Sequence, residues 1–182
     1  MYSPFCSSCW RLRLVGFEDG SFSAFAATIY IVWQMSCGHG CVCSGPFSSK
    51  LLCAKAKVTP IPHSKLSAGV LVSRLLLTTV EALCKLYEKP SNALILIDST
   101  CTINSLEANA KHLKPFFHNK RAEILENLEE IRHYCPIEER HHVSGSSNPA
   151  DIATRGDAKL EDMCPLNFCQ TGPSFLSGPW SS

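Results

Sequence analysis

The stretch SSNPADIATRG, from Ser146 to Gly156, follows a strand-like segment RHHV and has the features of a helix start. Pro149 suits a first helical turn because the N–H that proline lacks would have no partner there, and Asp151 suits the positive end of the helix dipole. Two more aspartates occupy comparable places: Asp19 in the strand-like RLRLVGFEDGS, and Asp98 after the apolar run ALILI. Three carboxylates at the ends of separate apolar elements are ligands of the kind that a two-metal nuclease site requires.

The periodicity of apolar residues predicts alternating strands and helices. Strands are expected at residues 12–17, 22–33, 51–59, 93–97 and 139–143, and helices at residues 64–88, 100–110 and 115–134, before the helix that carries Asp151. The segment from Glu18 to Ser21 is expected to form the turn between the first two strands. The run 93–97 is continuous and β-branched, which is typical of a central strand buried on both faces.

Length and composition favour one globular domain. A chain of 182 residues can bury one good core, and we expect a domain over residues 12–156, with a lead-in at 1–11 and a linker or truncated tail at 157–182. Apolar residues make up 45% and charged residues 18%, which is typical of a globular protein rather than a disordered one. The net charge of +1 gives no overall field toward nucleic acid, so any binding must come from a local patch.

The eleven cysteines are scattered and odd in number, and the first ten residues do not resemble a secretory leader. We therefore expect reduced thiols in a cytoplasmic or nuclear setting. The longest apolar run, Ala24–Trp33, is too short to span a membrane, which takes ~20 residues. The apolar stretch 66–83 is interrupted by Arg74 and Glu81, so no membrane segment is expected.

Four segments, taken in order, resemble the ribonuclease H-like part of BEL/Pao-type retroelement polyproteins. They are GFEDGSFSAFAATIYIV (16–32), KLLCAKAKVTPIP (50–62), LILIDSTCTINSL (94–106) and HHVSGSSNPADIATRG (141–156). The resemblance implies an α/β ribonuclease H-like fold, a five-stranded mixed sheet flanked by helices. It also implies hydrolysis of the RNA strand of RNA–DNA hybrids with Mg²⁺ (or Mn²⁺). Of the family's four acids, three match residues here, and the resemblance makes Asp19, Asp98 and Asp151 the catalytic and metal-binding residues.

The fourth acid of the family, a Glu on the first helix, is absent. The family pattern is roughly I-P-R-L-E-L, and residues 61–66 are IPHSKL, so Lys65 stands in the place of the Glu. Glu81 lies sixteen residues further along the same helix, ~24 Å away, and Glu18 should point to the face opposite Asp19, so neither is expected to replace it. We expect Lys65 to pair with an aspartate and to substitute electrostatically for a metal, which makes the enzyme weak or inactive. A register that leaves Lys65 outside the site is the alternative.

Two further groups of residues allow more than one interpretation. Cys37, His39, Cys41 and Cys43 form a C-x-H-x-C-x-C pattern that could bind zinc, although ordinary loop thiols fit its close spacing better. A basic segment with two phenylalanines could track phosphates, or it could be a solvated helix start; its proposed substrate-binding residues are Lys111, Lys114, Lys120 and Arg121. The leading hypothesis is an impaired hybrid-cleaving nuclease domain of retroelement origin. The alternative is a non-catalytic nucleic-acid- or protein-binding module with the same fold.

Overall fold

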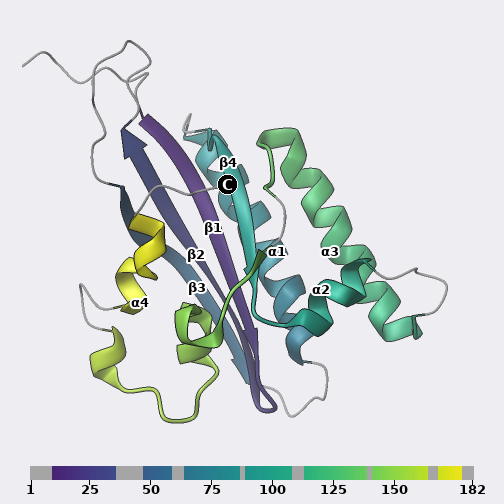
Figure 1. Ribbon diagram of the computed structural model, residues 1–182. Coiled ribbons are helices and arrows are strands. Elements are labelled where there is room, and N and C mark those ends of the chain that lie inside the picture. Colours follow the sequence, from purple (N-terminus) through teal and green to yellow (C-terminus); the bar gives the residue numbers. More distant parts are fainter. Residues whose placement is uncertain are drawn as a thin grey trace, which may run out of the picture.

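The computed structural model describes residues 10–35, 47–58, 64–86, 89–107, 113–138, 141–163 and 168–177. Its centre is a five-stranded sheet in the order β3-β2-β1-β4-β5 (Figure 1). The strands are β1 (Trp10–Gly20), β2 (Ala24–Met35), β3 (Ser48–Val58), β4 (Asn92–Ile97) and β5 (His141–His142). The first three strands are antiparallel neighbours, whereas β4 runs parallel to β1 and to β5. The predicted α/β fold with a mixed sheet flanked by helices is confirmed.

One face of the sheet, which we call the α1 face, is covered by the longest helices. These are α1 (Ser64–Lys85) and α3 (Pro115–Tyr134), with the shorter α2 (Thr100–Glu107) beside them (Figure 1). Strand residues Leu14, Ala27, Ile29, Ile95 and Ile97 pack there in one buried cluster with Val72, Leu76, Ile124 and Leu128 of the helices. The alternation of side chains along β1 explains this face, because residues two apart point to the same side of a sheet.

Gly16 lets α1 approach β1 closely. A Cβ atom at this position would lie 2.8 Å from Cγ2 of Val72, nearer than van der Waals contact allows. The missing side chain therefore sets the distance between the helix and the central strand, and with it the position of the first turn of α1.

The opposite face, which we call the C-terminal face, is covered by short helices. These are η3 (Gly145–Ser147), η4 (Pro149–Ala153), η5 (Leu160–Met163), α4 (Phe168–Thr171) and η6 (Ser174–Ser177). Buried side chains on this face include Val15, Phe17 and Tyr30 from the strands and Leu176 from η6. The hydroxyl of Tyr30 donates to the carbonyl of Cys169. Residues 168–177 thus belong to the folded core, in contrast to the linker predicted from their Pro, Gly and Ser content.

One local prediction is wrong. The segment from Glu18 to Gly20 is not a turn but the end of β1, because β1 and β2 stay paired as far as Gly20 and Phe25. The chain reverses at Ser21–Ser23, where the Ser21 hydroxyl accepts from the backbone N–H of Ala24. Asp151 lies in a short helix, the five-residue 3-10 helix η4.

By length and composition, the stretch Lys65–Lys85 of α1 could cross a membrane, but more than half of its most apolar window is buried against the protein. This is the burial expected of the central helix of a globular domain. The possible zinc motif at Cys37, His39, Cys41 and Cys43 lies outside the described residues, as do Lys111 and most of the lead-in.

Candidate active site

Asp19 and Asp98 lie side by side at the ends of two parallel strands. Their preceding residues, Glu18 and Ile97, are register partners in the pairing of β1 with β4. Burial raises the pKa of Asp98 to about 6, and hydrogen bonding and charge repulsion from Asp19 add to this effect, whereas the charge of Lys65 opposes it. Two carboxyl groups this close cannot both be ionised without cost, so the pair is suited to bind a cation or share a proton.

Asp151 is brought to the same end of the sheet by a polar clasp. Buried Asn148 donates from Nδ2 to the carbonyl of Glu18 at 2.8 Å, and its Oδ1 accepts from the N–H of Ala150 at 3.1 Å. The hydroxyl of Thr154 donates to the carboxylate of Asp19 and lies 3.1 Å from the carbonyl of Asp151. These contacts fix η4 against the end of β1. The charge of Asp151 also contributes to the raised pKa of Asp98.

Sequence reasoning did not single out Asn148 or Thr154. The signal for Asn148 was present, because asparagine directly before proline is a frequent helix cap. Nothing in the sequence marks the contact of Thr154 with Asp19, which joins residues 135 positions apart.

Lys65 lies in the first turn of α1 and reaches the site. Its Nζ atom is 4.0 Å from Oδ1 of Asp98, and its side chain is 49% exposed. An ion pair this exposed contributes at most about 1 kcal/mol to stability. Lys65 therefore faces the aspartates, and it can be displaced from them easily.

Glu18 is a fourth carboxylate at the site, which sequence reasoning set aside. Its side chain is completely buried, and neither Oε1 nor Oε2 has a hydrogen-bond partner. Burial raises the pKa of Glu18 well above its ordinary value; Asp98 and Asp19 raise it further, and Lys65 lowers it. Glu18 and Asp19 point to opposite faces of β1, as expected. Both carboxylates are nevertheless close enough to Asp98 to interact with it electrostatically.

The site is not a preformed metal centre. Among the residues that the structure describes, no three His, Cys, Asp or Glu side chains are arranged to hold one metal ion. Protein groups hold each aspartate instead: Thr154 contacts Asp19, Lys65 lies beside Asp98, and Arg155 pairs with Asp151. The chemistry of the donors still suits a divalent cation, because Glu18 and Asp98 offer three buried oxygens without a hydrogen-bond partner.

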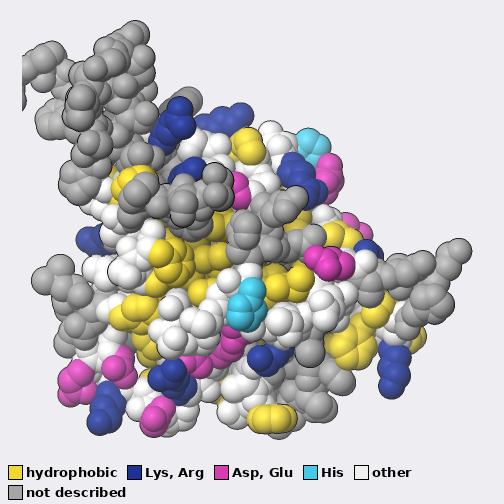
Figure 2. Space-filling model, viewed as in Figure 1, with side chains coloured by type: hydrophobic (Ala, Val, Ile, Leu, Met, Phe, Trp, Pro, Cys, Tyr) yellow, Lys and Arg dark blue, Asp and Glu magenta, His cyan; other side chains and the backbone are white. Residues whose placement is uncertain are grey.

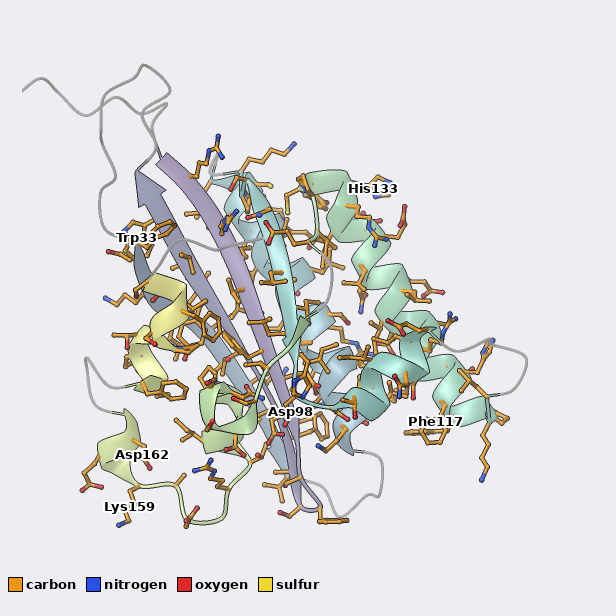
Figure 3. The ribbon with its side chains drawn as sticks, in the orientation of Figure 1. Trp33, Asp98, Phe117, His133, Lys159 and Asp162 are labelled. Carbon is orange, nitrogen blue, oxygen red and sulfur yellow. The ribbon has the colours of Figure 1, made fainter. Side chains whose placement is uncertain are left out.

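A polar pocket of about 460 Å³ adjoins Asp151. Charged side chains line much of it, namely Asp151, Arg155, Asp157, Lys159 and Asp162. Lys159 and Asp162 lie on the C-terminal segment, away from Asp98 at the end of β4 (Figure 3). Figure 2 shows acidic and basic side chains alternating along this edge, so it carries no field of one sign. His142 lies beside Asp98, and its Nε2 is 3.0 Å from the Asp98 carbonyl.

The predicted substrate-binding residues are spread over the start of α3. Lys114 is exposed and directly precedes the helix, and the ammonium of Lys120 lies 6.0 Å from the ring centre of Phe116. Arg121 instead donates from Nε to the carbonyl of Leu106, so part of its function is to join α3 to α2. Phe117 packs against the α1-face core rather than serving as an exposed ring (Figure 3).

Comparison with known protein families finds one match. The family model described as the Pao retrotransposon-like RNaseH-like domain matches residues 5–105, more than half of the chain. The chain belongs to this family. The match includes Asp19, Lys65 and Asp98 and ends before Asp151. No curated protein sequence matches the chain significantly.

Solved structures similar to this chain include ribonuclease H domains. RNase H1 from the archaeon Halobacterium salinarum is 14% identical, with a TM-score of 0.43 over 79% of this chain and 93% of that one. The N-terminal RNase H domain of rv2228c from Mycobacterium tuberculosis is also 14% identical, with a TM-score of 0.42 over 79% and 95% of the two chains. The PFV RNase H domain is 14% identical, with a TM-score of 0.39 over 92% and 94%.

Proposed function

We propose that this Pao-type domain binds RNA–DNA hybrids at the end of the sheet that carries Asp19, Asp98 and Asp151. We further propose that it is a weak or inactive endonuclease of the ribonuclease H type. The observation that carries the second part is the position of Lys65, whose ammonium lies 4.0 Å from the Asp98 carboxylate. An ammonium beside these carboxylates repels a divalent ion, and solvent screening of the half-exposed Lys65 side chain reduces this repulsion.

Mg²⁺ or Mn²⁺ is the cofactor that this carboxylate set would hold, with Asp19, Asp98 and Asp151 as the proposed ligands. When bound, such ions activate a water nucleophile and stabilise the leaving oxygen. The residues of this chain oppose loading in three ways. Lys65 repels the ion, Arg155 competes for Asp151, and the raised pKa of Asp98 keeps part of this carboxyl protonated near pH 6.

The start of α3 is the proposed contact with the phosphate backbone. Lys114 and Lys120 are placed to attract phosphates there, and the partly exposed ring of Phe116 can stack on a base. Arg121 has a structural contact and contributes less. Lys111 completes this proposed substrate-binding set from outside the described residues.

The decisive experiment changes the charge at position 65. With Mg²⁺ and a labelled hybrid, the wild-type chain should cleave poorly or not at all, and Lys65→Glu should cleave faster because it supplies a ligand and removes the repelling cation. Lys65→Ala removes only the cation and should recover less. Each protein is paired with its Asp98→Asn variant, which should abolish cleavage. Robust wild-type cleavage that depends on Asp98 would contradict the proposed effect of Lys65.

A non-catalytic binding module is the second candidate. Its supporting observation is that protein groups already contact or neutralise all three aspartates among the described residues. This candidate predicts that the wild-type chain binds a hybrid with the same affinity in EDTA as in Mg²⁺, and that Lys65→Glu gains no cleavage.

A further inference from the structure

Glu18 lies on the face of the sheet that α1 covers. Its register partners are Ala27 on β2 and Ile97 on β4, and both belong to the buried cluster of the α1 face. Gly16, two residues earlier on the same face, lies against Val72 of α1. The side chain of Glu18 is therefore enclosed between the sheet and the first helix.

The direction of α1 places its first turn near Glu18. Lys65 in that turn is 4.0 Å from Asp98, which follows the residue paired with Glu18. Lys65, Ala68 and Val72 follow one another at helical spacing on one side of α1. Because Gly16 is opposite Val72, Glu18 lies further toward the helix end that carries Lys65. A glutamate at position 65 would approach the aspartates from this same side.

Neither oxygen of the Glu18 carboxylate has a hydrogen-bond partner. Both of its oxygens and Oδ1 of Asp98 are buried without a hydrogen bond, and Lys65 at 4.0 Å is beyond hydrogen-bond distance of Asp98. Buried carboxylates are normally paired, hydrogen-bonded or bound to a metal ion. Three orphaned oxygens from adjacent strands are the kind of donor that a hard divalent cation takes.

We propose that Glu18 is the fourth carboxylate of this site, supplied by β1 in place of the first helix, and that Glu18 and Asp98 together take up one divalent cation. This inference rests on the proposed function, since it assumes that the aspartates form a cation site. The chain has a lysine on α1 and a glutamate on β1, so the site keeps four carboxylates although the helix carries none of them.

Lys65 occupies the place of the cation until one binds. With about half of its side chain exposed, its ammonium can leave Asp98 for solvent without disturbing the core. The described residues hold no ready-made group of three metal ligands, and this movement of Lys65 frees the oxygens of Glu18 and Asp98 for the ion.

The first test measures binding of Mn²⁺ alone, by the loss of the free-ion electron paramagnetic resonance signal. Compared with wild type, Glu18→Gln should weaken binding by roughly tenfold or more, because changes even in outer-shell groups cost about 10–100-fold. Asp98→Asn should weaken it similarly. Glu126→Gln on the exposed side of α3 is the matched control, and it should bind like wild type. Thermal unfolding in EDTA checks that each variant is folded.

The second test moves the carboxylate back to the helix. Glu18→Gln combined with Lys65→Glu should recover Mn²⁺ affinity to at least the wild-type level. Glu18→Gln combined with Lys65→Ala removes the same cation without supplying an acid, and it should recover less. Recovery only in the double variant with Lys65→Glu would show that Mn²⁺ binding needs a carboxylate at this place, supplied either by β1 or by α1.

The outcomes separate this inference from the proposed function. If Asp98→Asn loses Mn²⁺ while Glu18→Gln binds like wild type, Glu18 is not a ligand but the cation site stands. If wild type binds no Mn²⁺ and Lys65→Glu does, Glu18 does not complete the site and the proposed function survives. If Asp98→Asn, Glu18→Gln and the Glu126→Gln control all bind like wild type, both proposals fail.

Discussion

At the carboxyl end of β1, Asp19 points to the C-terminal face and Glu18 to the α1 face, and the two carboxylates meet different surroundings. Asp19 accepts a hydrogen bond from Thr154. Glu18, one residue earlier on the strand, has no hydrogen-bond partner for either oxygen. The same strand therefore presents one satisfied acid and one unsatisfied acid to the two sides of the sheet.

The difference follows from what covers each face. Short 3-10 helices and loops expose backbone and hydroxyl groups that can turn toward the sheet, as Thr154 and Asn148 do. A long α-helix uses its backbone groups internally and presents apolar side chains to the sheet, so α1 has little to offer a carboxylate except at its first turn. Short irregular elements can therefore supply hydrogen bonds to a carboxylate at a strand end, whereas a regular helix leaves such a group without a partner.

The largest effect should come from breaking the clasp on the C-terminal face. Asn148→Ala removes two hydrogen bonds, to the Glu18 carbonyl and the Ala150 N–H, and leaves both groups buried. We expect the free energy of unfolding to fall by about 2–4 kcal/mol, since each buried group left without a partner costs about 1–3 kcal/mol. Urea unfolding of both proteins measures this change in the free energy of unfolding. Asn127→Ala removes one partly buried hydrogen bond to Ser73 and should lower the unfolding free energy clearly less. An equal loss would show that the hydrogen bonds of Asn148 stabilise the fold no more than an ordinary partly buried bond.

The close approach on the α1 face can be tested at Gly16. Gly16→Ala places a methyl group 2.8 Å from Cγ2 of Val72, and we expect a loss of about 1–3 kcal/mol in unfolding free energy. Val72→Ala in the same chain should recover part of this loss, because it removes the atom in conflict. Gly145→Ala meets nothing within 4 Å and should be nearly neutral. A neutral Gly16→Ala would mean that α1 is not held this close to β1.

The unsatisfied acid should make stability depend on pH. The pKa of Glu18 is raised in the folded protein, so the folded state binds more protons than the unfolded one between the two pKa values, and stability falls as pH rises through that window. Below the unfolded pKa, ~4.3, Glu18→Gln should have little effect. As the pH rises further, the unfolding free energy of Glu18→Gln in EDTA should exceed that of wild type by an amount that grows by about 1.4 kcal/mol per pH unit. This growth should stop once the pH passes the pKa of Glu18 in the folded protein. A constant difference from pH 4 to pH 8 would contradict a buried, unpaired Glu18.

The smallest effect should come from the attachment of the C-terminal segment. Tyr30→Phe removes the hydrogen bond to the Cys169 carbonyl and should cost about 1 kcal/mol. Faster limited proteolysis within residues 168–177, with β1 and β2 still protected, is the expected signature. Unchanged proteolysis would show that Leu176 and its apolar neighbours hold the segment without this bond.

Much of the fold could be predicted because its elements are locally encoded. The helix expected at 115–134 has those bounds, and the strand expected at 93–97 begins one residue earlier, at Asn92. The turn after β1 was misplaced because its Asp-Gly pair suggests a reversal, whereas strand pairing carries β1 through Gly20. The tail was misjudged because a few buried residues, such as Cys169 and Leu176, anchor an otherwise polar segment.

The sequence by itself determined that acids stand at the ends of β1 and β4, that Lys65 opens the first helix, and that Glu18 and Asp19 point to opposite sides. Alternation along a strand is a local property and needs no knowledge of the rest of the chain. Only the tertiary structure decided that α1 covers the side of Glu18, which buries this carboxylate and brings it within the electrostatic influence of Lys65. Which face a crossover helix covers depends on strand order and the handedness of the connection, and both are long-range properties.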